Sequence, residues 1–129
     1  MKKIIMILVL SVVYLLGADF AQLVEKARGT NKLILVSLEQ EYCPYCERME
    51  KSVLSKKDIK EIINKKYVFI KLDINKDEIP EHLTSRLTPT FYFLSNDGTQ
   101  VLDMLKGLTK KSEFKFYLEE MYKQEMENN

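Results

Sequence analysis

The two cysteines of the chain, Cys43 and Cys46, are separated by Pro44 and Tyr45. They follow an apolar run directly and precede a stretch with helical periodicity. The amino end of a helix lowers the pKa of a thiol, because its unpaired N–H groups stabilise the thiolate. The sequence therefore predicts a dithiol that is nucleophilic near neutral pH and can cycle between a reduced and a disulfide form.

A structural role explains this pair poorly. Secreted domains use disulfides to join distant segments, whereas a disulfide between Cys43 and Cys46 closes a loop of only four residues. In the chain-entropy model such a loop stabilises the fold by only about 2 kcal/mol. A metal-binding module is an alternative, but structural zinc needs four ligands, and the chain has no further cysteine and only one histidine, His82. We therefore expect neither a metal nor another cofactor.

The first residues predict export. Two lysines follow the initiator methionine, and a largely apolar run over residues 4–16 leads to Gly17 and Ala18. A charged start, a short apolar core and small residues at its end describe a secretory signal peptide. We expect a signal peptide over residues 1–17 and a mature domain over residues 18–129. The alternative is an uncleaved anchor, although a membrane-spanning helix needs about 20 apolar residues.

Charge excludes some partners of the mature domain. Without residues 1–17, the 20 basic and 19 acidic side chains of the chain become 18 and 19. This balance gives no field that would attract nucleic acid or an anionic surface. The length suits one domain with its own core, and we expect a monomer.

A helix, a strand and a second helix are predicted around the dithiol. Apolar residues recur at helical spacing over residues 20–27, and the almost continuously apolar run 33–38 is typical of a strand covered on both faces. Pro44 suits a first helical turn, because its missing N–H would be unpaired there. That helix carries Cys46 on one face, together with Met49 and Val53.

The middle of the chain continues this alternation. Residues 55–58 resemble a capping box in front of a helix that carries Ile59, Ile62 and Ile63. Residues 67–73 predict a second buried strand. We expect Pro80 to open a short helix that includes His82.

The last third predicts a hairpin and a helix. Residues 91–94 form an apolar strand, the turn Asn96-Asp97-Gly98 has strong hairpin chemistry, and residues 101–105 supply the returning strand. Apolar residues at helical spacing over 114–121 predict a final amphipathic helix. The fold class is therefore α/β, with a mixed central sheet, parallel strands early, a hairpin late and helices on both faces.

This order of elements resembles the thioredoxin superfamily, because a C-x-x-C motif near a βαβ pattern is typical of a redox protein. Pro89, 43 residues beyond Cys46 and directly before the aromatic strand, strengthens the resemblance. In that superfamily the matching proline is cis and lies against the dithiol, so the resemblance implies a cis Thr88–Pro89 bond. The alternative is a trans proline at the start of a strand.

Within the superfamily, Glu41-Tyr42-Cys43-Pro44-Tyr45-Cys46 and Thr88-Pro89-Thr90 look like segments of exported bacterial thioredoxin-like proteins. Two positions depart from the usual pattern. Tyr42 stands where thioredoxins carry tryptophan, so the substrate contacts will differ. The buried aspartate of thioredoxins is matched by the region 36–38, which leaves open whether Glu39 or Glu41 moves protons through water.

The chemistry implied is an exchange between disulfides. We expect Cys43 to attack a disulfide of a partner protein and Cys46 to resolve the mixed disulfide. Cys43 should be the more exposed thiol, and Cys46, one turn into the helix, should be partly buried. Five further residues are expected to tune the dithiol or to contact the substrate: Pro44 and Tyr45 in the first role, and Tyr42, Thr88 and Pro89 in the second.

The sequence thus predicts a periplasmic thiol:disulfide oxidoreductase that reduces protein disulfides. The helical insertion of periplasmic oxidases is missing, which favours reduction over oxidation. Alternatives are an oxidase or isomerase on the same fold, and a non-catalytic binding module that docks through Tyr42, Tyr45 and Tyr92. The expected partners are protein disulfides or dithiols and, as electron donor, an inner-membrane thiol transporter.

Overall fold

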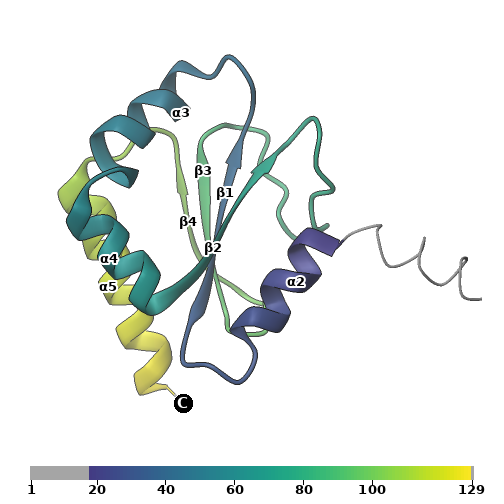
Figure 1. The fold of residues 1–129 in the computed structure, drawn as a ribbon, viewed down its shortest axis with the longest axis vertical. Coiled ribbons are helices and arrows are strands. Elements are labelled where there is room, and N and C mark those ends of the chain that lie inside the picture. The colour runs from purple at the N-terminus through teal and green to yellow at the C-terminus, as the bar shows by residue number, and fades with distance from the viewer. Residues whose placement is uncertain (1–17, 129) are drawn as a thin grey trace, which may run out of the picture.

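A computed structural model describes residues 18–128 and shows a four-stranded mixed sheet in the order β2-β1-β3-β4 (Figure 1). The central strand β1 (Leu33–Glu39) pairs in parallel with β2 (Tyr67–Asp73). On its other side β1 pairs antiparallel with β3 (Thr90–Leu94), which pairs antiparallel with β4 (Val101–Lys106). The predicted early parallel pair and late hairpin are therefore confirmed.

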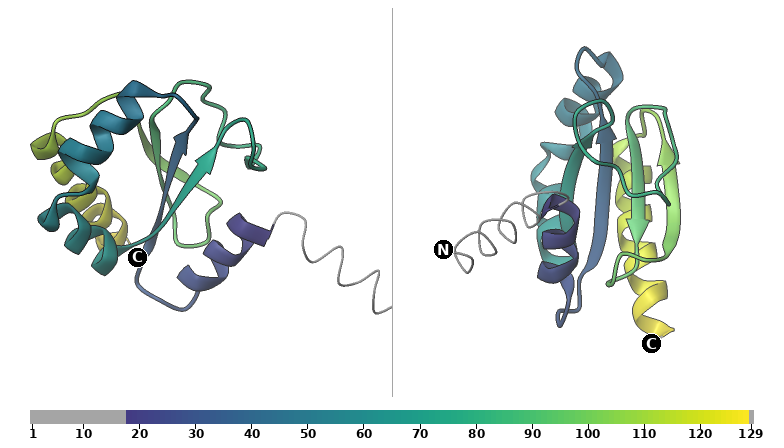
Figure 2. Two further views of the ribbon diagram at one scale, coloured as in Figure 1. Left: turned by 45° about the horizontal axis from the view of Figure 1, so that its top comes forward. Right: turned by 90° about the vertical axis from the view of Figure 1, so that its right-hand side faces the viewer.

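Helices cover both faces of this sheet (Figures 1 and 2). Helix α2 (Ala18–Ala27) lies on one face. The other face carries α3 (Pro44–Met49), the π-helical turn η1 (Glu50–Leu54), α4 (Lys57–Lys66) and α5 (Lys111–Glu127). The predicted layers are confirmed, whereas the predicted signal peptide lies outside the described residues.

Strand β1 divides the core into two parts. Its side chains alternate between the faces of the sheet, as the geometry of a strand requires. Leu33 and Leu35 pack into a cluster with residues of η1, α4 and α5, and Ile34 and Val36 pack into a second cluster with residues of α2. The side chains from Leu33 to Leu38 are all buried. The prediction of a strand covered on both faces is thus confirmed.

Strand β2 differs from the prediction. It was expected to be buried, yet it forms the edge of the sheet, and only Tyr67 and Leu72 within it are buried. Lys71 is exposed. A run of apolar residues indicates that a segment forms a strand. Whether that strand lies in the centre or at the edge of the sheet depends on the chain topology.

The segment before Pro89 also differs from the prediction. Pro80 opens no helix; one turn forms, in which the Leu83 N–H donates to the Pro80 carbonyl at 2.9 Å. His82 therefore does not lie on a helix, and its Nε2 lies 2.8 Å from the carbonyl oxygen of Gly98. Only Leu83 is apolar between residues 81 and 86, so a helix here would have no apolar stripe to bury.

The predicted capping box at residues 55–58 is wrong as well. The N-cap of α4 is Lys56, which makes no side-chain cap, and the hydroxyl of Ser55 donates back to the Lys51 carbonyl at 3.0 Å. The reason is the π-helical turn η1, which continues α3 and makes Ser55 its C-terminal cap. The spacing of apolar residues did not predict this π-helical turn, because Met49 and Val53 are both buried, as the prediction of an ordinary helix also required.

The predicted turn at residues 96–98 joins β3 to β4. It also contacts α2 and the loop that leads from α2 to β1. Gly98 has φ +75°, a left-handed conformation that glycine adopts without strain, and an added Cβ would lie 3.0 Å from a methyl group of Val24. The Asn96 side-chain amide donates to the carbonyls of Ala27 and Lys32, each at 2.7 Å. The hairpin thus fixes the connection between α2 and β1.

Tyr67 links the sheet to α5 and should make stability depend on pH. Its buried hydroxyl donates to the Leu118 carbonyl at 2.5 Å, and burial raises the pKa of Tyr67 well above its ordinary value of 10.0. Above about pH 10 the unfolded chain therefore ionises this phenol while the folded chain does not, so stability falls by up to about 1.4 kcal/mol per pH unit.

We expect Tyr67→Phe to lower the free energy of unfolding by about 1 kcal/mol at pH 7 and to remove this alkaline loss. Urea unfolding between about pH 8 and pH 11 measures both effects. Tyr45→Phe, at an exposed tyrosine, is the matched control. An alkaline slope that is the same in Tyr67→Phe and in the wild type would contradict the assignment.

Candidate active site

Cys43 and Cys46 form a disulfide at the start of α3. Cys43 is the N-cap of this helix, and its Sγ accepts a hydrogen bond from the backbone N–H of Cys46 at 3.2 Å. A proline in the first turn and an extended conformation at Cys43 allow the helix to begin here. An N–H group of the helix terminus therefore points at the first sulfur, where it would stabilise a thiolate.

A distant segment completes the site. The Thr88–Pro89 peptide bond is cis, the conformation that the resemblance implies. The Sγ atom of Cys43 lies 3.4 Å from the Thr88 hydroxyl oxygen and 3.8 Å from the Thr88 carbonyl oxygen. The structure thus brings the predicted residues Cys43 and Thr88 into contact, although 45 positions separate them.

The expected order of exposure is wrong. Cys43 was expected to be more exposed than Cys46, yet their exposed fractions are 7% and 9%. The disulfide holds the two sulfur atoms together, and Thr88 lies against the sulfur of Cys43. A partner disulfide must therefore approach closely, and burial alone does not distinguish the attacking thiol from the resolving thiol.

Three exposed apolar side chains are next in sequence to Cys43, Cys46 or Thr88. Tyr42 is 96% exposed and Tyr45 is 56% exposed, and the Arg48 guanidinium lies 5.8 Å from the centre of the Tyr45 ring. Leu87, directly before Thr88, is 53% exposed. We call Tyr42, Tyr45 and Leu87 the apolar rim. Leu87 was not predicted as a site residue, because a single leucine in a loop does not indicate that its side chain is exposed.

Tyr42 has an unusual backbone conformation. Its φ is +55°, a left-handed value that costs a non-glycine residue about 1 to 2 kcal/mol. The strain falls on the residue that directly precedes Cys43. In this conformation the ring of Tyr42 is almost wholly exposed to solvent, where a substrate can contact it.

Acidic groups near the end of β1 differ in their surroundings. Burial raises the pKa of the Glu39 carboxyl, an effect that Lys71 opposes from 3.9 Å, and the Ser37 hydroxyl lies 3.5 Å from Glu39 Oε1. Glu41 is exposed and forms an ion pair with Lys76. Of the two glutamates considered for proton transfer, Glu39 therefore has the surroundings that favour holding a proton.

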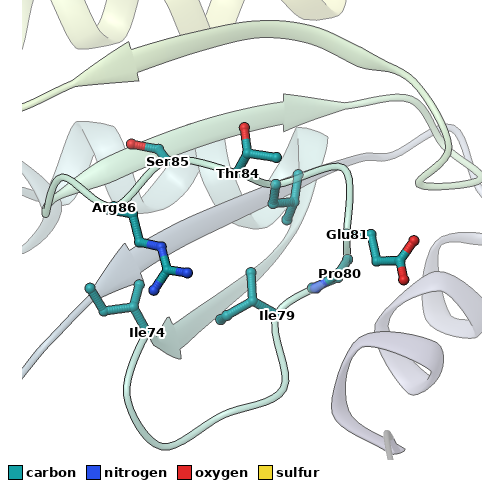
Figure 3. Close-up of a pocket in the computed structure, with 8 residues that line it drawn as sticks. Ile74, Ile79, Pro80, Glu81, Thr84, Ser85 and Arg86 are labelled. Carbon is teal, nitrogen blue, oxygen red and sulfur yellow. The ribbon is translucent and has the colours of Figure 1, made fainter.

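A hollow of about 320 Å³ lies in the segment that leads to Thr88. Ile74, Ile79 and Leu83 give it apolar walls, and the guanidinium of Arg86 extends toward Ile74 and Ile79 (Figure 3). Neither a thiol nor a histidine lines this hollow. Neither cysteine and neither Thr88 nor Pro89 lines it, so the hollow adds no group to the dithiol site.

Residues 18–128 contain neither a cluster of metal ligands nor a membrane-spanning helix. No group of three or more His, Cys, Asp or Glu side chains within this range is placed to hold a metal ion. Among the helices of the same range, none combines the length and the apolar character needed to cross a membrane.

The sequence profile of the thioredoxin-like domain matches residues 20–122, which is most of the chain. The chain belongs to the thioredoxin-like family. A thioredoxin-like domain with a C-x-x-C disulfide is a thiol:disulfide oxidoreductase in its chemistry. A comparison with curated protein sequences gives no significant match.

Solved structures share the fold of this thioredoxin-like protein. A thioredoxin from Thermus thermophilus is 24% identical, with a TM-score of 0.67 over 78% of this chain and 82% of that chain. The periplasmic thioredoxin SoxS from Paracoccus pantotrophus, in its reduced form, is 23% identical, with a TM-score of 0.57 over 72% and 98%. The C-terminal domain of DsbD from Neisseria meningitidis, in its oxidised form, is 18% identical, with a TM-score of 0.65 over 81% and 93%.

Proposed function

We propose that this thioredoxin-like protein reduces disulfides of exported proteins in the periplasm through its Cys43/Cys46 dithiol. The observation that supports this most is the position of Cys43 Sγ, which accepts a hydrogen bond from the Cys46 N–H in the first turn of α3 and contacts Thr88 beside the cis-proline. A thiolate at this position is stabilised by hydrogen bonds and lies beside an exposed apolar rim that can receive a polypeptide.

The proposed reaction has two exchange steps. The Cys43 thiolate attacks one sulfur of the partner disulfide; a bond forms between Cys43 and that sulfur, and the other partner sulfur leaves as a thiolate and takes up a proton. Cys46, as a thiolate, then attacks the Cys43 sulfur and displaces the second partner thiol. Two electrons pass from the dithiol to the partner, and the Cys43–Cys46 disulfide seen in the structure is the product.

The proposed direction of electron transfer and the proposed location in the periplasm are both inferred from the sequence. The charged and apolar residues 1–17 predict export, and the chain from α3 to Pro89 has no room for the additional helical domain of periplasmic oxidases. The similarity to a periplasmic thioredoxin is in keeping with this compartment. Because NADPH is not available there, we propose an inner-membrane thiol transporter as the electron donor. Tyr42, Thr88 and Pro89 would contact the substrate, and Pro44 and Tyr45 would tune the dithiol.

The reduction of insulin by dithiothreitol tests the proposal. The protein without residues 1–17 should accelerate precipitation of the insulin B chain at least about tenfold over dithiothreitol alone, because the thiolate lowers the barrier to exchange. A chelator should leave this rate unchanged, which separates the proposal from a metal-binding module. No acceleration of insulin reduction, together with rapid oxidation of a reduced unfolded protein, would identify an oxidase instead.

A further inference from the structure

A chain of hydrogen bonds leads from an exposed polar side chain to the sulfur of Cys43. The Gln40 amide Nε2 donates to the Thr88 hydroxyl oxygen at 3.0 Å, and that oxygen lies 3.4 Å from Cys43 Sγ. We propose that Gln40 is a positioning residue, which holds the Thr88 hydroxyl as a hydrogen-bond donor to Cys43 and thereby stabilises its thiolate. The proposal rests on the proposed function, because it assigns a role within the same site.

The directions of these bonds follow from the number of hydrogens. A threonine hydroxyl carries one hydrogen and two lone pairs. Toward Gln40 the hydroxyl of Thr88 acts as an acceptor, because the amide NH₂ can only donate. In the disulfide the Cys43 sulfur carries no hydrogen, so Thr88 must be the donor in the contact between them.

Gln40 is itself oriented by a neighbour. Its Oε1 accepts from the Asn75 side-chain amide at 3.5 Å, which turns the oxygen of Gln40 toward Asn75 and the NH₂ group toward Thr88. The Asn75 backbone is held in turn by the Asp73 carboxylate, to which its N–H donates at 2.8 Å. The loop after β2 therefore determines which end of the Gln40 amide faces the active site.

The hydrogen bonds of Thr88 and Gln40 affect the pKa of Cys43 once the disulfide is reduced. A thiolate at Cys43 would keep two donors, the Cys46 N–H and the Thr88 hydroxyl, and hydrogen bonds to the charged form lower a pKa. The Thr88 carbonyl at 3.8 Å has the opposite effect, because it can accept only from the neutral thiol. Without Gln40 the hydroxyl can rotate away from the sulfur, which leaves the thiolate with one donor fewer.

The pKa of Cys43 in the reduced protein tests this proposal. It is measured from the pH dependence of alkylation at Cys43, mapped by mass spectrometry. Gln40→Met keeps the length of the side chain but removes the donor, and it should raise the pKa by about half a unit; Thr88→Val removes the hydroxyl and should raise it by about one unit. The double variant should match Thr88→Val alone, because Gln40 acts only through the hydroxyl.

Two controls separate positioning from general disturbance. Thr88→Ser keeps a hydroxyl and should keep a pKa close to that of the wild type. Gln100→Met changes an exposed glutamine in the hairpin at the other end of β3 and should have no effect.

An unchanged pKa in Gln40→Met, or an equal shift with and without the Thr88 hydroxyl, would overturn the proposal. Failure of the proposed function would look different, since the wild type would then not reduce insulin even if these pKa shifts were observed.

Discussion

Cys43→Ser should lower insulin reduction to the rate of dithiothreitol alone, a loss of at least about tenfold relative to the wild type. A serine hydroxyl has an ordinary pKa far above that of a thiol and forms no disulfide, so the first exchange step has no nucleophile. The contacts of Cys43 with the Cys46 N–H and with Thr88 make it the sulfur best placed for that step. Steady-state insulin precipitation measures the loss.

The fold should survive this substitution. The disulfide closes a loop of four residues, which is worth only about 2 kcal/mol in the chain-entropy model. The proper reference is the reduced wild type, in which the same bond is open, and the two proteins should unfold at similar urea concentrations. Insulin reduction that is clearly faster than with dithiothreitol alone in a folded Cys43→Ser protein would refute the assignment of the nucleophile.

Cys46→Ser should accumulate covalent adducts with partner proteins. Attack by Cys43 still occurs, but the thiol that releases the partner is missing, so the mixed disulfide persists. We expect most of the variant to carry an added mass after incubation with insulin under non-reducing conditions, and dithiothreitol should remove that mass. Intact-protein mass spectrometry detects the adduct, and peptide mapping should place the bond at Cys43.

The comparison with Cys43→Ser decides the order of the two thiols. Both cysteines are nearly buried, so their exposure does not identify the attacking sulfur. The difference lies in their contacts, because Cys43 is the helix N-cap and touches Thr88, whereas Cys46 lies one turn into α3. If Cys43→Ser trapped as much partner as Cys46→Ser, the two roles would be interchangeable and the proposed order would be wrong.

Local patterns predicted much of the fold. The continuous apolar run of β1 and the turn at residues 96–98 specify their structures through neighbouring residues, and both were predicted from the sequence. The helix start at Pro44 was predicted for the same reason, because proline and the cysteine spacing act within one turn. The position of the dithiol at that helix terminus followed directly.

Features that depend on distant segments were not predicted. β2 is an edge strand because of the order of strands, which its own residues do not encode. The contact between Gln40 and Thr88 joins residues 48 positions apart. Thr88 was predicted as a site residue because it precedes Pro89, but no pattern in the sequence indicates a role for Gln40. The positive φ of Tyr42 and the π-helical turn after α3 also depend on how the chain packs around the dithiol.

The most direct test of the account is the equilibrium between the Cys43–Cys46 disulfide and dithiothreitol, followed by the fraction of free thiols in the folded protein. We predict one reversible two-electron transition with a reduction potential close to the −270 mV or so of thioredoxin. A potential near the −120 mV or so of a strong disulfide-forming oxidase, or a disulfide that dithiothreitol opens only after unfolding, would contradict a reductase that works through this pair.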